Sequence, residues 1–78
     1  MRLTVKYFGQ IAECTGRNSE LLEAKGQSVS QLINQLNTKY PGLIDLAFTV
    51  AVDKNLVPQE TVLTQDAEVA LLPPFSGG

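Results

Sequence analysis

The apolar and polar positions at the start of the chain alternate residue by residue. Over residues 2–8 this alternation places Leu3, Val5 and Tyr7 on one face of an extended segment. A period of two is typical of a half-buried strand, because successive side chains of a strand point to opposite faces of the sheet. We therefore predict a first strand over residues 2–8, with these three side chains in the core.

A second pattern, with helical spacing, follows in the middle of the chain. Ser28 and Gln31 form a capping-box sequence, in which each side chain bonds the backbone N–H of the other residue. Pro41 and Gly42 end the segment. Between these signals the apolar residues recur every three or four positions, as Val29, Leu32, Ile33, Leu36 and Tyr40. The pattern predicts one amphipathic helix with a single apolar stripe.

Shorter elements fill the rest of the chain. In order, we expect a helical turn over residues 10–15, strands over 19–25, 48–52 and 56–57, an irregular or short helical link over 60–63, and a last strand over 68–72. The pattern leaves open whether Leu21 or Leu22 faces inward. Residues 53–55 are typical of a hairpin turn, and Pro58 ends the next strand or moves it to a sheet edge. This order predicts the α+β class, with a mixed sheet and one main amphipathic helix packed across it.

Composition and charge narrow the classes of partner. The chain has 78 residues, enough for one domain, and a net charge of −2. Its six basic residues are scattered, so nothing indicates a nucleic-acid or membrane partner. No apolar run is long enough to span a bilayer, and the alternating first residues are unlike a signal peptide. The single cysteine, Cys14, cannot form an internal disulfide, and these features together predict a cytoplasmic protein.

The residues offer no self-sufficient catalytic site. There is no histidine, and no nucleophile–base pair is visible in the sequence. We interpret Cys14 as a half-buried packing residue rather than a sulfur acceptor. The pairs Glu20–Glu23 and Asp66–Glu68 fall in turn-rich segments that we expect to be solvated, which disfavours an acid–base role. We therefore predict a chain that is not a catalyst alone and has no metal site.

The last residues of the sequence have a chemical use. Pro73 and Pro74 cannot donate ladder hydrogen bonds, so they end the last strand and direct the final residues away from the sheet. The sequence ends in Gly77 and Gly78, and a glycine carboxylate fits a slot too narrow for any residue with a side chain. A Gly-Gly ending also occurs by chance at frayed termini. Its position after a strand, two prolines and an aromatic residue favours a carrier tail.

Two stretches of the chain carry a resemblance to a known family. Residues 66–78 (DAEVALLPPFSGG) and 3–13 (LTVKYFGQIAE) resemble the small, sulfur-carrier subunit of molybdopterin synthase, the MoaD type of the MoaD/ThiS ubiquitin-like family. The resemblance extends over essentially the whole chain. It implies a β-grasp (ubiquitin-like) fold, with the first and last strands parallel at the centre of the sheet. It also implies a β-grasp domain over residues 1–73 and a flexible, sulfur-carrying C-terminal tail over residues 74–78.

The resemblance further implies a chemistry for this tail, in which Ser76 and Gly77 precede the reactive Gly78. A separate ATP-dependent enzyme adenylates the carboxylate of Gly78, and a sulfur donor converts it to a thiocarboxylate. The sulfur then passes to a cyclic pterin precursor on a large synthase subunit and builds the dithiolene of molybdopterin. The implied assembly is a heterotetramer of two small and two large subunits. No cofactor is bound permanently, and the activating enzyme uses the ATP.

Energetics indicate that such a tail docks together with a surface patch. Ordering each backbone residue costs about 1–2 kcal/mol, whereas full burial of Phe75 returns only roughly 1.5–3 kcal/mol. A patch on the sheet must therefore supply the net affinity. We predict a docking patch, with a lysine on its rim to pair acidic partner residues, made of Phe8, Leu72, Pro74, Phe75 and Lys6 or Lys54. Core packing is the competing interpretation of Phe8 and Leu72.

Three other functions compete with the molybdopterin pathway. A thiamine-pathway carrier of the ThiS type shares the Gly-Gly ending and has a central segment like residues 56–60. The length of this chain, residues 8–13 and the Pro-Pro-Phe sequence before the tail count against it. A ubiquitin-type modifier would use the same adenylate to form isopeptide bonds with lysines. The last alternative is a small binding domain whose Gly-Gly ending has no role.

Overall fold

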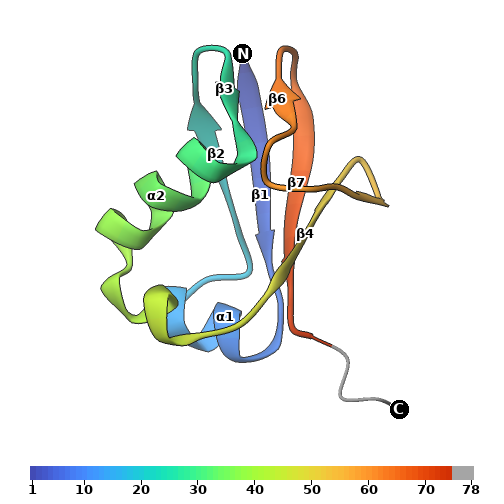
Figure 1. Cartoon of the computed structure of the whole chain (residues 1–78). Coiled ribbons are helices and arrows are strands. Elements are labelled where there is room, and N and C mark those ends of the chain that lie inside the picture. Colours follow the sequence, from blue (N-terminus) through green and yellow to red (C-terminus); the bar gives the residue numbers. More distant parts are fainter. Residues whose placement is uncertain (75–78) are drawn as a thin grey trace.

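The computed structural model describes residues 1–74, which form a five-stranded mixed sheet and a smaller two-stranded one (Figure 1). The strands of the larger sheet lie in the order β2 (Ser19–Glu23), β1 (Arg2–Tyr7), β7 (Ala67–Leu72), β4 (Thr49–Val52) and β5 (Asn55–Leu56). β1 and β7 are parallel neighbours, and the other pairs are antiparallel. The first and last strands therefore lie side by side within the sheet, as the β-grasp prediction requires.

One helix, α2 (Val29–Lys39), covers one face of the five-stranded sheet. Its capping box is present: Gln31 N donates to Ser28 Oγ at 3.1 Å, and Ser28 N donates to Gln31 Oε1 at 2.8 Å. The apolar stripe of α2 meets alternate residues of the strands. The resulting core consists of Leu3, Val5, Tyr7, Ile11, Val29, Leu32, Ile33, Leu36, Leu43, Val50, Leu63, Val69 and Leu71. The predicted α+β arrangement is thus confirmed.

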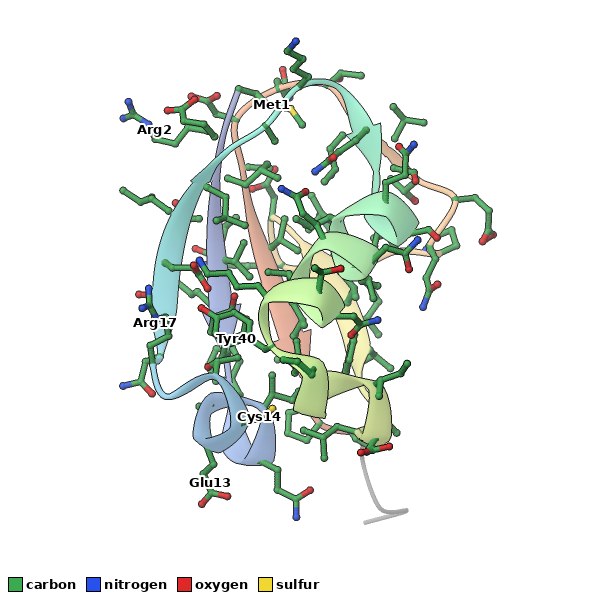
Figure 2. The ribbon with its side chains drawn as sticks, turned by 90° about the vertical axis from the view of Figure 1, so that its left-hand side faces the viewer. Met1, Arg2, Glu13, Cys14, Arg17 and Tyr40 are labelled. Carbon is green, nitrogen blue, oxygen red and sulfur yellow. The ribbon has the colours of Figure 1, made fainter. Side chains whose placement is uncertain are left out.

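Two short helical segments complete the covered side of the sheet. α1 (Gly9–Thr15) ends at Gly16, whose φ of 77° is a left-handed conformation that glycine adopts without steric cost. η1 (Pro41–Asp45), a 3-10 helix, follows the end of α2 at the predicted Pro41–Gly42 boundary. Cys14 of α1, labelled in Figure 2, is half-buried. A Cβ added to Gly42 would lie 2.9 Å from its Sγ. The side chain of Cys14 therefore packs half-buried against the core, as predicted, whereas the absence of a role as sulfur acceptor stays a prediction.

The structure differs from the predicted elements at several boundaries. β3 (Gln27–Ser28) and β6 (Val62–Leu63) form the two-stranded sheet, so the link predicted as irregular or helical over 60–63 contains a strand instead. The strand predicted over 19–25 ends at Glu23, although Ala24 and Met1 still exchange two backbone hydrogen bonds in the register of β1 and β2. Within β2, Leu22 packs against the core and Leu21 is exposed. The residue that faces inward, which the sequence left open, is therefore Leu22.

Candidate functional site

The face of the sheet opposite α2 carries an apolar hollow of about 380 Å³, here called the sheet-face hollow. It forms because Ala70 and Leu72 alternate along β7 with Val69 and Leu71, which point into the core. Ala51 lies opposite Ala70 in the register of β4 and β7, and Leu56 lies opposite Ala51 in that of β4 and β5. The lining residues are Phe8, Ala51, Lys54, Leu56, Glu68, Ala70 and Leu72.

The structure brings three predicted docking residues together at this hollow. Phe8, Leu72 and Lys54 all line it, although they come from three separate parts of the chain. Phe8 is 43% exposed, and Leu72 lies half-buried on the helix-free side of β7. The competing interpretation of these two residues, plain core packing, is therefore wrong. Their role in docking stays a prediction.

Of the other predicted site residues, some are described but do not line the hollow, and the rest lie outside the described part of the chain. Lys6 does not line the hollow, and its Nζ lies 3.3 Å from Glu68 Oε2 in an ion pair beside it. Pro74 is exposed just beyond β7. The remaining predicted residues, which lie outside the described part of the chain, are Phe75, Ser76, Gly77 and Gly78.

Four lining residues were missed by the sequence analysis. The alternation of β7 could have indicated Ala70 and Glu68, because both share the face of Leu72. No local signal indicates Ala51 or Leu56, since they reach the hollow only through pairing between strands. Leu56 is 71% exposed, which makes it the most exposed apolar side chain in the hollow.

The two charged side chains of the hollow differ in their partners. Glu68 is paired with Lys6, whereas among residues 1–74 no carboxylate lies within ion-pair distance of Lys54. Lys54 lies in the hairpin turn between β4 and β5, where Asp53 and Lys54 have positive φ values of 48° and 72°. Two consecutive positive φ values define a type I′ turn. The hollow thus combines apolar walls with an available cation.

A buried polar cluster around Glu20 lies on the covered side of the sheet. The Glu20 side chain is only 4% exposed, so the expectation that it is solvated was wrong. Lys39 Nζ donates to Glu20 Oε1 at 2.6 Å, and Tyr40 Oη donates to Oε2 at 2.6 Å. Tyr7 Oη also donates to Oε2, at 2.5 Å. Figure 2 labels Tyr40, which follows the end of α2, and Arg17, whose Nη1 lies 3.7 Å from Glu20 Oε1.

These contacts set the ionisation of the cluster. Burial alone would raise the pKa of Glu20, but the hydrogen bonds from Lys39, Tyr40 and Tyr7 outweigh it and lower this pKa from 4.5 to about 2. Burial and the Glu20 carboxylate raise the pKa of Tyr7 and of Tyr40. The hydrogen bond to Glu20 raises the pKa of Lys39. Because its donors converge on one carboxylate, the cluster ties β1, β2 and the end of α2 together.

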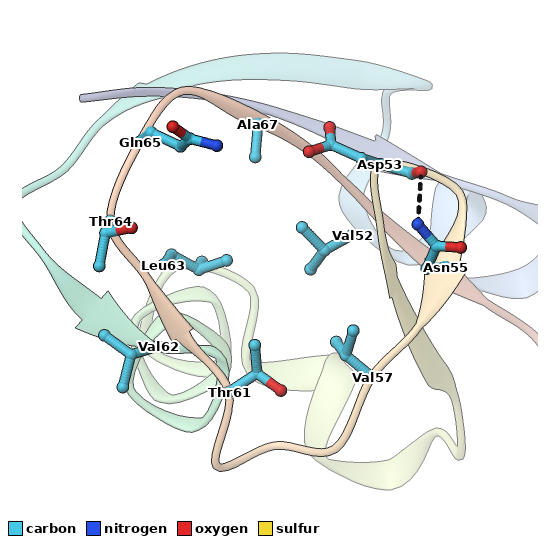
Figure 3. A pocket seen from close by; sticks show the side chains of 10 residues that line it. All are labelled: Val52, Asp53, Asn55, Val57, Thr61, Val62, Leu63, Thr64, Gln65 and Ala67. Atoms are coloured by element: carbon cyan, nitrogen blue, oxygen red, sulfur yellow. Dashed lines mark hydrogen bonds between the residues drawn. The ribbon is translucent and has the colours of Figure 1, made fainter.

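A second hollow, of about 230 Å³, lies on the other side of the β4–β5 hairpin (Figure 3). Val52, Asp53, Asn55 and Val57 of the hairpin region line one part of it, and residues 61–65 with Ala67 line the rest. Asn55 Nδ2 donates to the backbone oxygen of Asp53 at 3.2 Å. The hairpin therefore separates two hollows, with Lys54 and Leu56 facing the first and Asp53 and Asn55 facing the second.

Neither a metal centre nor a membrane span is found in the part of the chain that the structure describes. Within residues 1–74, no three His, Cys, Asp or Glu side chains lie close enough to hold a metal ion. No helix there is long and apolar enough to cross a membrane.

Comparisons with known proteins identify the family. The molybdopterin synthase sulfur carrier subunit of Mycobacterium tuberculosis is 38% identical over 82 residues, which cover 100% of this chain and 99% of that protein. The solved structure of small archaeal modifier protein 1 from Haloferax volcanii is similar, with a TM-score of 0.83 and 20% identity over 100% of both chains. A complex of subunits 1 and 2 of molybdopterin-converting factor from Helicobacter pylori contains a similar chain, with a TM-score of 0.71 and 22% identity over 100% of both chains.

At these identities the two solved structures show a shared fold, and they confirm the ubiquitin-like β-grasp architecture. The full-length curated relative shows more than the fold, because 38% identity spans the whole chain. The model of the ThiS family matches residues 5–78, nearly the entire sequence. The chain therefore belongs to the ThiS family, as the resemblance of its two ends to sulfur carriers predicted.

Proposed function

We propose that this chain is the sulfur-carrying small subunit of a molybdopterin synthase. The observation that carries the proposal is the 38% identity, across the full length of both chains, with a relative named molybdopterin synthase sulfur carrier subunit. The alternating β7 leads through Pro73 and Pro74 to a sequence that ends in Gly77 and Gly78. In this proposal the carboxylate of Gly78 is the reactive group, and the protein acts in the cytoplasm.

The proposed chemistry begins with activation, because a carboxylate is a poor electrophile. A separate enzyme joins the Gly78 carboxylate to the AMP part of ATP and releases pyrophosphate. A sulfur donor then attacks the acyl carbon and AMP leaves, which produces a thiocarboxylate. The thiocarboxylate sulfur stays ionised at neutral pH and attacks a carbon of a cyclic pterin precursor, from which an oxygen substituent leaves, so that an acyl thioester joins the carrier to the pterin. Water then hydrolyses this thioester, which leaves the sulfur on the pterin and restores the carboxylate. The chain itself binds no permanent cofactor in this scheme.

The sheet-face hollow is the proposed contact surface for the large subunit. Burying an exposed apolar side chain of the size of Leu56 or Phe8 is worth roughly 1.5–3 kcal/mol. Both line the hollow and both are exposed in the free chain. Their burial offsets the cost of ordering the tail, about 1–2 kcal/mol for each backbone residue. We propose that two such carriers join two large subunits in a heterotetramer.

Of the two lysines predicted for the rim, the structure favours Lys54 over Lys6. Lys54 lines the hollow and has no carboxylate partner among residues 1–74, whereas Lys6 is already paired with Glu68. A new ion pair with Lys54 would not have to break an existing one. We therefore propose that an acidic side chain of the large subunit contacts Lys54.

The test is a native pull-down with the full chain, in which the bound proteins and the mass of the carrier are read together. The proposal predicts a pterin-binding large subunit and a carrier in which one oxygen of Gly78 is replaced by sulfur. Recovery of a thiazole synthase would move the same chemistry to the thiamine pathway. Isopeptide-linked carrier on lysines of other proteins would instead indicate a modifier. A carrier that stays unmodified after ATP and an adenylating enzyme are supplied would contradict the proposal.

A further inference from the structure

We propose that Asp53 is a positioning residue that fixes the hairpin wall of the sheet-face hollow, and with it Lys54 and Leu56. This inference rests on the proposed function, because the wall matters only if a partner docks there. Asp53 itself faces the second hollow, on the opposite side of the hairpin (Figure 3). It therefore acts through its neighbours and is not expected to touch the partner.

Asp53 joins the hairpin to β7 by two hydrogen bonds. The regular pairing of β4 with β7 ends at Val52 and Val69. One residue further, Asp53 N donates to Glu68 O at 2.9 Å, and Glu68 N donates to Asp53 Oδ1 at 3.0 Å. The carboxylate oxygen thus takes the place of the Asp53 backbone oxygen, which would accept from Glu68 N if the regular pairing continued. The side chain of Asp53 thereby extends the pairing of β4 with β7 by one residue pair, at the point where the backbone turns away.

The turn needs this support because its backbone conformation is costly. Asp53 and Lys54 have φ values of 48° and 72°, and neither is glycine. A left-handed conformation costs a residue with a side chain about 1–2 kcal/mol, although Asp tolerates it better than most residues. The following strand, β5, holds the hairpin by two residue pairs with β4, and one further backbone bond, from Val57 N to Val50 O at 3.1 Å, lies beyond them. The bond between Glu68 N and Asp53 Oδ1 is therefore a main constraint on where this wall lies.

The hairpin wall positions Lys54 and Leu56, the two residues that the proposed docking uses. Lys54 is the turn residue directly after Asp53, and Leu56 is the exposed apolar residue of β5. Glu68 donates its backbone N–H to Asp53 and pairs its own side chain with Lys6. Glu68 is thereby kept from neutralising Lys54, which stays available to a partner carboxylate.

The first test needs no partner and measures amide hydrogen exchange of Glu68 in the free, full-length chain. Asp53→Ala removes the acceptor, so the Glu68 amide should exchange at least about tenfold faster. Asp53→Asn keeps an Oδ1 acceptor and a side chain that tolerates positive φ, and it should restore wild-type protection. An unchanged Glu68 exchange rate in Asp53→Ala would overturn the inference, whatever the function of the protein.

The second test measures the affinity of purified large subunit for the same variants. Asp53→Ala should weaken binding about fivefold, and Asp53→Asn should bind within about twofold of wild type. Asp66→Ala is the matched control, because Arg2 N donates to Asp66 Oδ1 at 2.7 Å in the same kind of bond, away from the hollow. It should leave the affinity unchanged. Equal losses of affinity in the two alanine variants would mean that Asp53 contributes only to general stability, and would overturn the inference.

A double-mutant cycle decides whether Asp53 acts through Lys54. Lys54→Gln alone should weaken binding and reduce its dependence on salt, because one ion pair is lost. Adding Lys54→Gln to Asp53→Ala should then cost less than it does alone. If the losses of binding free energy in Asp53→Ala and Lys54→Gln were fully additive, Asp53 would not act through Lys54. If the wild-type chain binds no large subunit, the proposed function fails. The exchange experiment still decides whether the hydrogen bond from Glu68 N to Asp53 Oδ1 holds the hairpin.

Discussion

The two faces of the five-stranded sheet differ in how completely their side chains are satisfied. On the face under α2, the apolar side chains are buried, and even the charged Glu20 accepts hydrogen bonds from three donors. On the opposite face, Phe8 and Leu56 are exposed, and Lys54 has no carboxylate partner among residues 1–74. The covered face is built for stability, and the open face retains unmet interactions.

This difference assigns separate tasks to the two faces. Exposed apolar surface and an unpaired cation contribute little to folding, but both gain free energy when a partner covers them. A positive φ at two residues that are not glycine is likewise found on the open side, in the turn that carries Lys54. Variants of the covered face should therefore change unfolding, and variants of the open face or the tail should change function alone.

The largest functional effect is expected at the end of the sequence. Gly78→Val adds a branched side chain beside the reacting carboxylate, so a slot shaped for glycine should exclude it. Thiocarboxylate formation should be abolished while the unfolding temperature stays at the wild-type value. Intact mass after incubation with ATP, an adenylating enzyme and a sulfur donor measures the first quantity. A variant that accepts sulfur at the normal rate would contradict the narrow-slot hypothesis.

The largest stability effect is expected at Glu20 on the covered face. Its pKa is about 2 in the folded chain against 4.5 ordinarily, so between these values the unfolded state binds more protons. The stability that Glu20 contributes is therefore complete above about pH 5 and is lost as the pH falls toward 2. Glu20→Gln should lower the free energy of unfolding at neutral pH by on the order of 3 kcal/mol. Denaturant unfolding across this pH range measures it.

Glu23→Gln is the matched control for this prediction. Glu23 lies on the same strand and pairs with Arg2, but both side chains are exposed, at 75% and 64%. Exposed ion pairs contribute about 0–1 kcal/mol, so this variant should unfold almost as wild type does. If both variants lost equal stability, or if Glu20→Gln kept the wild-type acid sensitivity, the cluster would not be the source of the effect.

An intermediate effect, on binding alone, is expected at Leu56 of the open face. Leu56→Ala removes apolar surface from the hollow and should weaken binding of the large subunit about tenfold. Because Leu56 is exposed in the free chain, its truncation should change the free energy of unfolding by less than about 0.5 kcal/mol. Calorimetric titration and denaturant unfolding measure the two quantities.

Leu21→Ala provides the comparison for Leu56→Ala. Leu21 is also exposed, but it lies on β2 at the far edge of the same sheet and does not line the hollow. Its truncation should leave both affinity and stability near wild type. Equal loss of affinity in the two variants would mean that the partner covers the far sheet edge as well, and the docking surface would have to be redrawn.

An effect on stability smaller than that of Glu20→Gln is expected at Gly9, between Phe8 of the hollow and the end of β7. Gly9 has a φ of 56°, and a Cβ added there would lie 3.1 Å from Pro73 Cγ. Gly9→Ala should destabilise the chain by about 1–2 kcal/mol. Gly16→Ala has the same backbone cost, with a φ of 77° and no atom within 4 Å of the added Cβ. The difference between their unfolding free energies isolates the contact with Pro73, and a larger loss at Gly16 would argue against this contact.

The sequence predicts the covered face well because its signals are local. The alternation of residues 2–8, the stripe of α2 and the Ser28–Gln31 capping box each lie within one element. β3 and β6 were missed because two residues are too few to display a period. Glu20 was expected in solvent because its burial depends on donors from α2 and β1, which no pattern within β2 reveals.

The open face is harder to predict from the sequence because it is assembled by strand pairing. Phe8 and Leu72 were predicted as docking residues, and each lies at the end of a strand expected from the sequence, over residues 2–8 and 68–72. Leu56 and Ala51 join them only through the register of β5 with β4 and of β4 with β7. Asp53 was assigned to a turn, but its bond to the Glu68 backbone depends on which strand lies beside that turn.

The measurement that tests the central claim most directly is a single-turnover transfer experiment. Thiocarboxylated carrier is mixed with the large subunit and a cyclic pterin precursor, and the mass of the carrier is followed together with the pterin product. We predict that the carrier loses its sulfur, regains a carboxylate on Gly78, and that sulfur appears in the pterin. A carrier that keeps its sulfur in the presence of both would contradict the account.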